Sequence, residues 1–195
     1  MAIRRRRDEI RKRLEAEASP QAREREQLHA PGSFVIGVRI PKLRALAAEY
    51  KMPFEEAADY LDVVSPAQVR EELLLGIFAL ARWPTQVAGL RWRQMASWIQ
   101  AVDNRKVCDH MAESILAIVV SAHEELASEL DRMAEAENAW MRRMALWTAS
   151  VMQARDRRHA PFTERLCERL AKDRDSMIRE SVRAIRRQLA KAKAG

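Results

Sequence analysis

Two short stretches of the sequence combine charged, amide and aromatic side chains in patterns that could support chemistry. The first is "AVDNRKVCDHM", residues 101–111, which places Arg105 four residues before Asp109. On a helix this spacing brings both side chains to one face, where an ion pair is favoured. The second is "NAWMRRMALW", residues 138–147, in which two arginines interrupt an apolar and aromatic helical pattern. Together they could form a reaction site, a nucleic-acid contact or a solvated surface.

The other reactive side chains of the first stretch have simpler interpretations. Cys108 and His110 lie two residues apart, so on a helix they point to different faces. A zinc site needs three or four converging ligands, and the sequence offers no second close pair of them. We therefore expect no metal and no cofactor, and we expect Cys108 to fill a half-buried helix face rather than act as a nucleophile.

Length and composition predict a single domain that spans residues 1–195. Hydrophobic residues make up 48% of the chain and charged residues 32%, which is typical of a folded, soluble protein. No window approaches the ~20 apolar residues that a membrane span needs. The basic start has no apolar core behind it and so does not resemble a secretory signal. With only two cysteines, we expect a monomer in a reducing cytoplasm, without a disulfide framework and away from the membrane.

The net charge of +7 is concentrated at the two ends of the chain. Residues 1–13 hold seven Arg or Lys against two Asp or Glu, and residues 179–195 hold six against one. The middle of the chain is therefore mildly acidic. This asymmetry fits a polyanionic partner contacted by the ends, or else two solubilising helix faces. Residues 1–18 are expected to form either a mobile basic arm or an N-terminal helix.

Hydrophobic periodicity predicts an all-α fold. Ile178, Val182, Ile185 and Leu189 recur on one face of a helix, and alternation typical of a strand appears only in "FVIGVRI". From about residue 65 the predicted helix pairs recur at roughly 35–40 residues, the spacing of HEAT-like repeats. We therefore predict an α-solenoid, a superhelix of helix pairs, with a plain helical bundle as the alternative.

Four segments, in order and separation, resemble those of the AlkD-type DNA alkylation repair proteins, a family of HEAT-like repeat DNA glycosylases and their non-catalytic relatives. Together they cover about residues 33–190. The segments are "VIGVRIPKLRALAAEY", "SPAQVREELLLGIFAL", "AVDNRKVCDHM" and "NAWMRRMAL". The resemblance implies a concave face that binds DNA. It also implies attack on cationic N-alkylated purines that are not drawn into a pocket.

The resemblance assigns site residues position by position. The family's catalytic Asp falls on Asp109, and its Arg that grips DNA beside the lesion falls on Arg143. The Trp found four residues before that Asp is replaced here by Arg105. A second register moves the Asp to Asp103 and the Trp position to Ile99. We prefer the first, because "DHMAESILA" continues the helical pattern and keeps the spacing to Arg143.

The replacement of that tryptophan has a direct physical consequence. Hydrolysis of the bond to a cationic purine needs negative charge beside the developing sugar cation, together with a positioned water. An indole face would attract the cationic base by about 0.5–2 kcal/mol, whereas an arginine repels it. An ion pair between Arg105 and Asp109 would also offset part of the charge that the reaction uses.

Further cationic and aromatic residues are expected to contact DNA. Three cations surround a helix start at "RIPKLR", where backbone N–H groups and the helix dipole favour a phosphate. Four arginines of the last helix lie one step round from its apolar stripe, where they would line a groove or form a solvated face. The expected DNA contacts are Arg39, Lys42, Arg44, Trp140, Arg179, Arg183, Arg186 and Arg187.

Three functions are consistent with these patterns. The first is a glycosylase that releases cationic alkylpurines such as 3-methyladenine and 7-methylguanine. The second is a non-catalytic relative that recognises damaged or branched DNA, and the third is a HEAT-like scaffold that binds proteins. Salt-dependent DNA binding would separate the third from the other two, and release of a methylated base would separate the first from the second.

Overall fold

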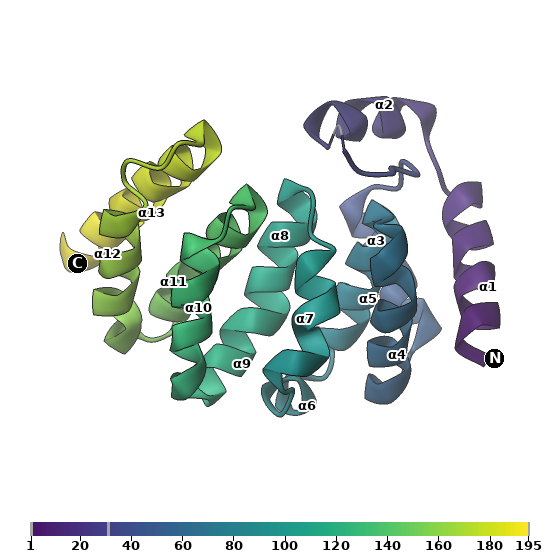
Figure 1. Ribbon diagram of the computed structural model, residues 1–195. Helices are drawn as coiled ribbons and strands as arrows, with labels where there is room; N and C mark the ends of the chain where they lie inside the picture. The colour runs from purple at the N-terminus through teal and green to yellow at the C-terminus, as the bar shows by residue number, and fades with distance from the viewer. Residues whose placement is uncertain (1, 31, 195) are drawn as a thin grey trace.

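The computed structural model describes residues 2–30 and 32–194, and its regular elements there are helices (Figure 1). The predicted all-α class is confirmed. The α-helices are α1 Ala2–Ala16, α2 Pro20–His29, α3 Ile40–Tyr50, α4 Phe54–Val64, α5 Arg70–Leu80, α6 Pro84–Ala88, α7 Trp92–Gln100, α8 Arg105–Met111, α9 Ala117–Ala122, α10 Ala127–Glu135, α11 Ala139–Arg155, α12 Ala160–Arg169 and α13 Ser176–Ala194.

The helices start where local chemistry satisfies their first backbone N–H groups. Helices α2, α3, α6 and α12 carry a proline in the first turn, where the missing N–H costs nothing. Helices α8 and α11 instead begin after Asn104 and Asn138, whose side-chain oxygens accept a backbone N–H. These signals are legible in the sequence, which explains why the helix order could be predicted.

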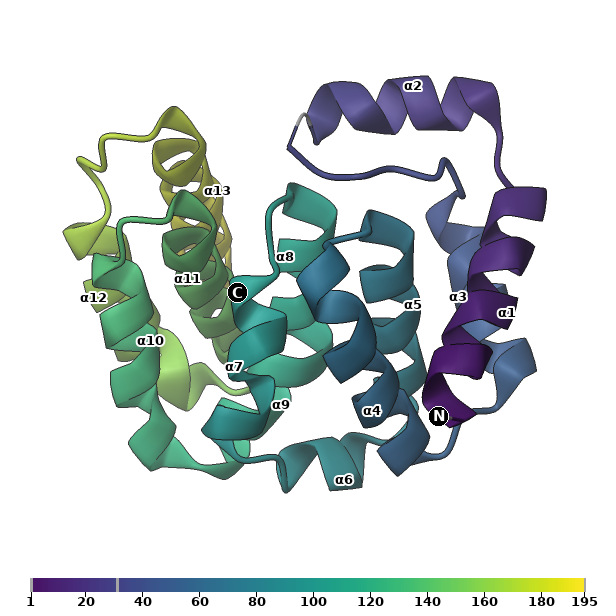
Figure 2. The same cartoon turned by 45° about the vertical axis from the view of Figure 1, so that its right-hand side comes forward.

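Most of the helices form two rows that pack against each other (Figures 1 and 2). One row runs α3, α5, α8, α11 and α13, each in contact with the next. The other row contains α4, α7, α10 and α12, of which α4 covers α5, α10 covers α11, and α12 contacts both α11 and α13. Apolar residues from both rows form one continuous core. No helix of the described part of the chain is both long and apolar enough to pass through a membrane.

The helical rod that carries Asp109 has an irregular turn directly after it. Helix α8 continues through a π-helical segment, Ala112–Leu116, into α9. A π-turn inserts an extra residue into the helix, and such turns occur frequently at functional sites. The helical register therefore changes directly after Met111, where the π-helical segment begins.

The segment with strand-like alternation does not form a sheet. It runs as an extended chain beneath α2, with one isolated parallel bridge between Phe34 and Val69 (Figure 2). Its backbone N–H groups at residues 36–38 donate instead to the buried carboxylate of Glu71, over 2.9–3.4 Å. Gly37 has a φ of 102°, and a Cβ there would lie 2.6 Å from the Cβ of Arg23. Only glycine fits this close approach to α2.

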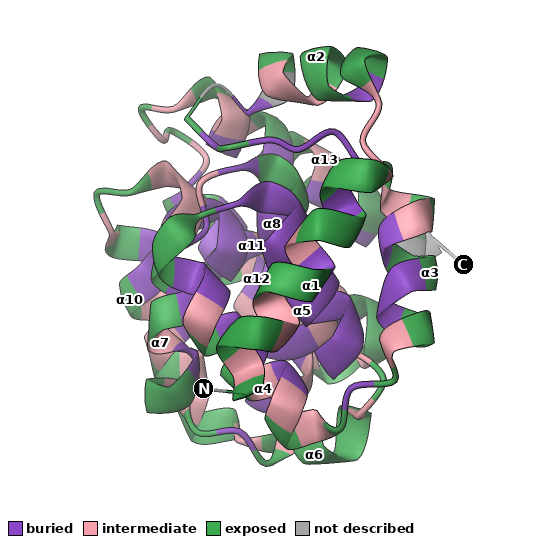
Figure 3. Cartoon of the chain, turned by 90° about the vertical axis from the view of Figure 1, so that its right-hand side faces the viewer, coloured by how far each residue is buried: buried purple, intermediate pink, exposed green. Residues whose placement is uncertain are grey.

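The basic N-terminus forms helix α1 and packs on α4 (Figure 3). Ile10 and Leu14 are fully buried, and the guanidinium groups of Arg7 and Arg11 donate to Glu72, which has no exposed surface. The pKa of Arg7 is raised, chiefly by that hydrogen bond. The described part of this segment is thus a helix fastened to the core by ion pairs rather than a mobile arm.

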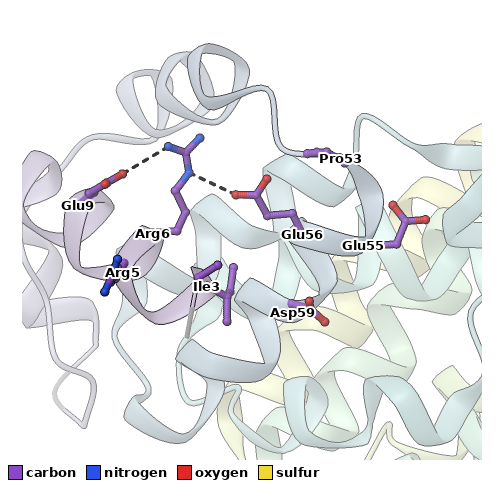
Figure 4. Close-up of a pocket in the computed structure, with 9 residues that line it drawn as sticks. Ile3, Arg5, Arg6, Glu9, Pro53, Glu55, Glu56 and Asp59 are labelled. Carbon is purple, nitrogen blue, oxygen red and sulfur yellow. Dashed lines mark hydrogen bonds and ion pairs between the residues drawn. The ribbon is translucent and has the colours of Figure 1, made fainter.

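A cavity of about 740 Å³ opens between α1 and α4 (Figure 4). Arg6 lies at its edge and pairs with Glu9 at 3.4 Å and with Glu56 at 3.3 Å. Its third contact is the carbonyl of Tyr50 at 3.2 Å. Arg5 also lines this cavity, but none of the site residues predicted from the sequence does, so it is not the predicted site.

Candidate functional site

Asp109 and Arg143 are in direct contact. Arg143, on α11, directs Nε and Nη2 to the same oxygen, Oδ1 of Asp109, at 3.0 and 2.7 Å. Its remaining nitrogen, Nη1, donates to the hydroxyl of Ser181 on α13. The resemblance implies an arginine that grips DNA and is therefore exposed, but Arg143 is only 2% exposed. Three helices of one row therefore meet at this cluster.

Arg105 contacts Asp109 from the preceding turn of α8. Its Nε lies 3.6 Å from Oδ2 of Asp109, which is close enough for an ion pair but too long for a hydrogen bond. The Arg105 side chain is 65% exposed, so solvent screens the pair and its contribution is small. Oδ2 accordingly accepts no hydrogen bond from any described residue.

Asp109 lines a cavity of about 580 Å³ together with Arg105 and Trp140. The sequence placed Trp140 among the DNA contacts, and the structure places it in the wall of the same cavity as Asp109. The walls come from the start of four helices and from α2. The other described lining residues are Arg25, Glu26, Ala30, Arg70, Asn104, Lys106 and Met177.

Two asparagines hold the cavity walls in place. Oδ1 of Asn104 accepts the N–H of Val107 at 3.0 Å, and its Nδ2 donates to Ser33 at 3.2 Å, which ties α8 to the segment after α2. Asn138, 34 residues further along the chain, accepts the N–H of Trp140 at 2.8 Å. Equivalent asparagine caps thus begin α8 and α11. They fix the position of Asp109 along its helix axis relative to that of Arg143.

The alternative register finds no site in the structure. Asp103 precedes α8, and its carboxylate accepts a hydrogen bond from Asn104 at 2.9 Å. It makes no described contact with Arg143. Ile99, the residue that this register puts at the tryptophan position, is buried in the core at 2% exposure. The geometry favours Asp109.

Cys108 and His110 take no part in the cluster around Oδ2. Cys108 is fully buried, and burial raises the pKa of its thiol far above the usual range, so it is not a nucleophile at neutral pH. His110 packs on the edge of Phe78 with ring centroids 4.9 Å apart. Burial, and then the nearby charge of Arg44, lower the pKa of His110, so its imidazole is neutral at pH 7.

The three cations of "RIPKLR" do not line the cavity that contains Asp109. Arg39 is exposed at the start of α3. Lys42 pairs with Glu17 at 3.0 Å, and the Arg44 guanidinium lies 4.6 Å from the centre of the Phe78 ring. They lie apart from the Asp109 cluster, and their contact with DNA stays a prediction.

The four arginines of α13 do not form the single stripe that the sequence suggested. Arg183 and Arg187 line a second cavity, of about 410 Å³, together with Arg143. Arg179 instead donates to the carbonyls of residues 173 and 174, and Arg186 donates to the carbonyl of residue 167 on α12. The difference arises because α12 and the loop after it pack beside α13: a carbonyl of α12 accepts from Arg186, and two carbonyls of the loop accept from Arg179.

Sequence reasoning missed several side chains of the site. Lys106 and Arg25 line the first cavity, and Ser181 anchors Arg143. Arg70 also lines this cavity but is only 1% exposed. It pairs with Glu71 at 2.8 Å and with Glu26 of α2 at 2.9 Å, so its charge is compensated. Ser181 lies one helix pair after Arg143, and this position is the sequence signal that could have identified it as part of the site.

The architecture and the site define a class of protein: an all-helical chain of paired helices with one carboxylate set among arginines beside an open cavity. The profile of the family described as DNA alkylation repair enzyme matches residues 10–195, and the chain belongs to that family. DNA is therefore its substrate or partner. Neither the curated proteins nor the solved structures that were searched include a significant match.

Proposed function

We propose that this protein is a DNA glycosylase that releases cationic N-alkylated purines, such as 3-methyladenine and 7-methylguanine, with Asp109 as its catalytic carboxylate. One observation carries the proposal. Arg143 holds Asp109 through Oδ1 alone, so Oδ2 is left without a hydrogen bond beside a cavity of about 580 Å³. A carboxylate that is fixed by hydrogen bonds at one oxygen, with only a solvent-screened ion pair at the other, can act on a bound substrate.

The chemistry needs little from the leaving group, because a cationic purine departs as a neutral base. The sugar carbon becomes positive as the bond to the base breaks, and a nearby carboxylate stabilises that charge. Oδ2 of Asp109 is available for this, or for orienting the attacking water. Arg143 acts as a positioning residue, since its buried guanidinium and its bond to Ser181 fix the carboxylate.

The aromatic face that the family resemblance leads us to expect is supplied in part by another residue. Trp140 lines the same cavity as Asp109 and Arg105 and is half-buried. A cationic base over its indole would gain about 0.5–2 kcal/mol. Arg105 opposes this gain by repelling the same base, so we propose that release by the wild-type protein is slow.

Binding to DNA is proposed to use a concave face of an α-solenoid. Contacts between residues 34 apart recur in neighbouring helix pairs: Asp109 with Arg143, Asp131 with Arg165, and Glu135 with Arg169. Such regular spacing is characteristic of HEAT-like repeats. The row that contains α8, α11 and α13 would face the duplex.

The proposal is tested by incubating methylated DNA with the protein and measuring free 3-methyladenine and 7-methylguanine, beside a DNA-binding titration. Release that depends on Asp109 supports the glycosylase. Salt-dependent binding without release supports the second candidate, a non-catalytic relative, which the ion contact between Arg105 and Asp109 favours. Absence of both would exclude either DNA function.

A further inference from the structure

The second cavity, between α11 and α13, lies next to the first but has a different character. Its volume is about 410 Å³, and it shares Arg105 and Met177 with the cavity that contains Asp109. These two side chains therefore stand between a compartment for the reacting base and a neighbouring compartment. The neighbouring one is lined by Trp147 and by a group of arginines that outnumber its one acidic residue, Glu180.

The arginines differ in how far their charge is used. Arg143 is buried, and all three of its side-chain nitrogens are hydrogen-bonded to Asp109 or Ser181. Arg183 and Arg187 are exposed, and neither makes a hydrogen bond or ion pair with a described residue. Their guanidinium donors are therefore free to bind an anion bidentately.

The two free arginines also repel each other. Arg183 and Arg187 are four residues apart on α13, which puts like charges side by side on one helix face. Arg105 faces the same compartment from α8, with its side chain 65% exposed. An anion bound among the three would relieve this repulsion, whereas an empty compartment leaves it in place.

Counting charges indicates how negative that anion is. The described lining residues include four arginines, among them Arg143, and one carboxylate, Glu180. The carboxylate of Asp109 also lies against Arg143 and Arg105. Four positive and two negative charges leave two positive charges uncompensated. An internal DNA phosphate carries one negative charge, but a terminal phosphate carries about −1.5 to −2 at pH 7.

Trp147 indicates what is attached to the phosphate. It is half-buried in the compartment, with the Arg143 guanidinium 5.5 Å from its ring centre. Together with Met177 it provides an apolar surface on which a base or sugar can pack. A nucleotide inside a duplex must be unpaired and unstacked before it can enter such a recess, whereas a nucleotide at a strand end is already open on one side.

We propose that this compartment, defined by Arg105, Arg183, Arg187 and Trp147, binds the terminal phosphate and last nucleotide of a DNA strand. The inference rests on the proposed role of this face in DNA binding. It adds a second class of ligand, the phosphorylated strand end, to the alkylated base. Free mononucleotides share the same chemistry, and the experiment separates the two sources.

The test compares three labelled duplexes with the same one-nucleotide gap, whose ends carry a 5′-phosphate, a 3′-phosphate or hydroxyl groups only. Fluorescence anisotropy measures the affinity of the full-length protein at one fixed salt concentration. We expect at least one phosphorylated gap to bind about tenfold more tightly than the hydroxyl gap. The double variant Arg183→Gln/Arg187→Gln should reduce this preference to about one.

The matched control is Arg93→Gln/Arg157→Gln, which removes two exposed arginines on other elements that bond to no described residue. It should keep the tenfold preference. Equal binding of all three gaps, or an unchanged preference in the Arg183/Arg187 variant, would overturn the inference. Deoxyadenosine monophosphate, added at the same concentration as the gapped duplex, should not displace that duplex from the protein. Displacement would also overturn the inference, in favour of binding to a free nucleotide.

The outcome is independent of the proposed base release, which is measured on intact methylated duplex. Base release without a preference for phosphorylated ends would leave the glycosylase standing and remove only this inference. A phosphate preference without base release would do the reverse.

Discussion

Arg143 directs two of its nitrogens, Nε at 3.0 Å and Nη2 at 2.7 Å, to a single oxygen of Asp109. An arginine facing a free carboxylate usually binds both oxygens, one to each arm of its fork. Here the third nitrogen is drawn instead to Ser181, which turns the guanidinium across the carboxylate. The consequence is a carboxylate that is held rigidly and keeps one oxygen for another partner.

Replacing Arg105 by tryptophan should increase the release of cationic alkylpurines about ten- to a hundredfold. The substitution removes a cation that repels the base and contacts Oδ2 of Asp109, and it adds an indole face. Single-turnover release of 7-methylguanine is the measurement. Arg105→Gln is the matched control, because it removes the charge alone and should give only part of the gain. If Arg105→Trp binds DNA normally and gains nothing, the site lacks something other than an aromatic ring.

The two pairs of arginines on α13 should behave differently in a salt titration of DNA binding. Arg183→Ala/Arg187→Ala removes two free cations and should reduce the slope of log affinity against log salt by about two. Arg179→Ala/Arg186→Ala removes arginines whose donors are taken by backbone carbonyls, and the slope should stay nearly unchanged. An equal decrease of the salt slope in both double variants would show that both pairs of arginines on α13 contact DNA.

Asp173 should stabilise the fold in a pH-dependent way. It accepts two hydrogen bonds from Arg142, at 2.7 and 2.9 Å, between side chains that are each 6% exposed. Partial burial raises the pKa of Asp173, but the hydrogen bonds from Arg142 and from a backbone N–H outweigh it, and the pKa lies below its usual value. A lowered carboxyl pKa gives stability that is complete above the unfolded value of about 4 and is lost as the pH falls.

Asp173→Asn should therefore lower the free energy of unfolding by about 2 kcal/mol at pH 7, within the range of about 1.5–3 kcal/mol for hydrogen bonds to charged groups. The difference from the wild type should shrink as the pH falls below about 4. Urea unfolding at several pH values measures both. Asp59→Asn, an exposed aspartate with no described hydrogen bond, is the control and should change little at any pH. A difference for Asp173→Asn that is constant between pH 3 and pH 7 would contradict the ion pair as its source.

Much of the fold was legible in the sequence because its helices carry their own boundaries. Proline in the first turn and asparagine caps mark the starts, and the apolar period marks the buried face of each helix. The extended segment around Gly37 was less legible. Its backbone hydrogen bonds go to Glu71 on another element, and no local pattern reports a carboxylate 34 residues away.

The site was predicted in part for a similar reason. The spacing of two matched segments predicted that Asp109 and Arg143 belong to one site, but not that they are in direct contact. The burial of Arg143 did not, because it depends on Ser181 from a third helix. The division of the α13 arginines depends on where α12 and the loop after it pack, which the periodicity within α13 alone does not determine.

The central claim is that the free oxygen of Asp109 takes part in releasing the base. The most direct measurement is the single-turnover rate of 7-methylguanine release from methylated duplex by Asp109→Asn compared with the wild type, with DNA binding measured on the same samples. Asparagine keeps the size of the side chain and a carbonyl oxygen for Arg143 but removes the charge. We predict that release falls to the uncatalysed level while DNA binding changes little. Release by Asp109→Asn at the wild-type rate would contradict the claim.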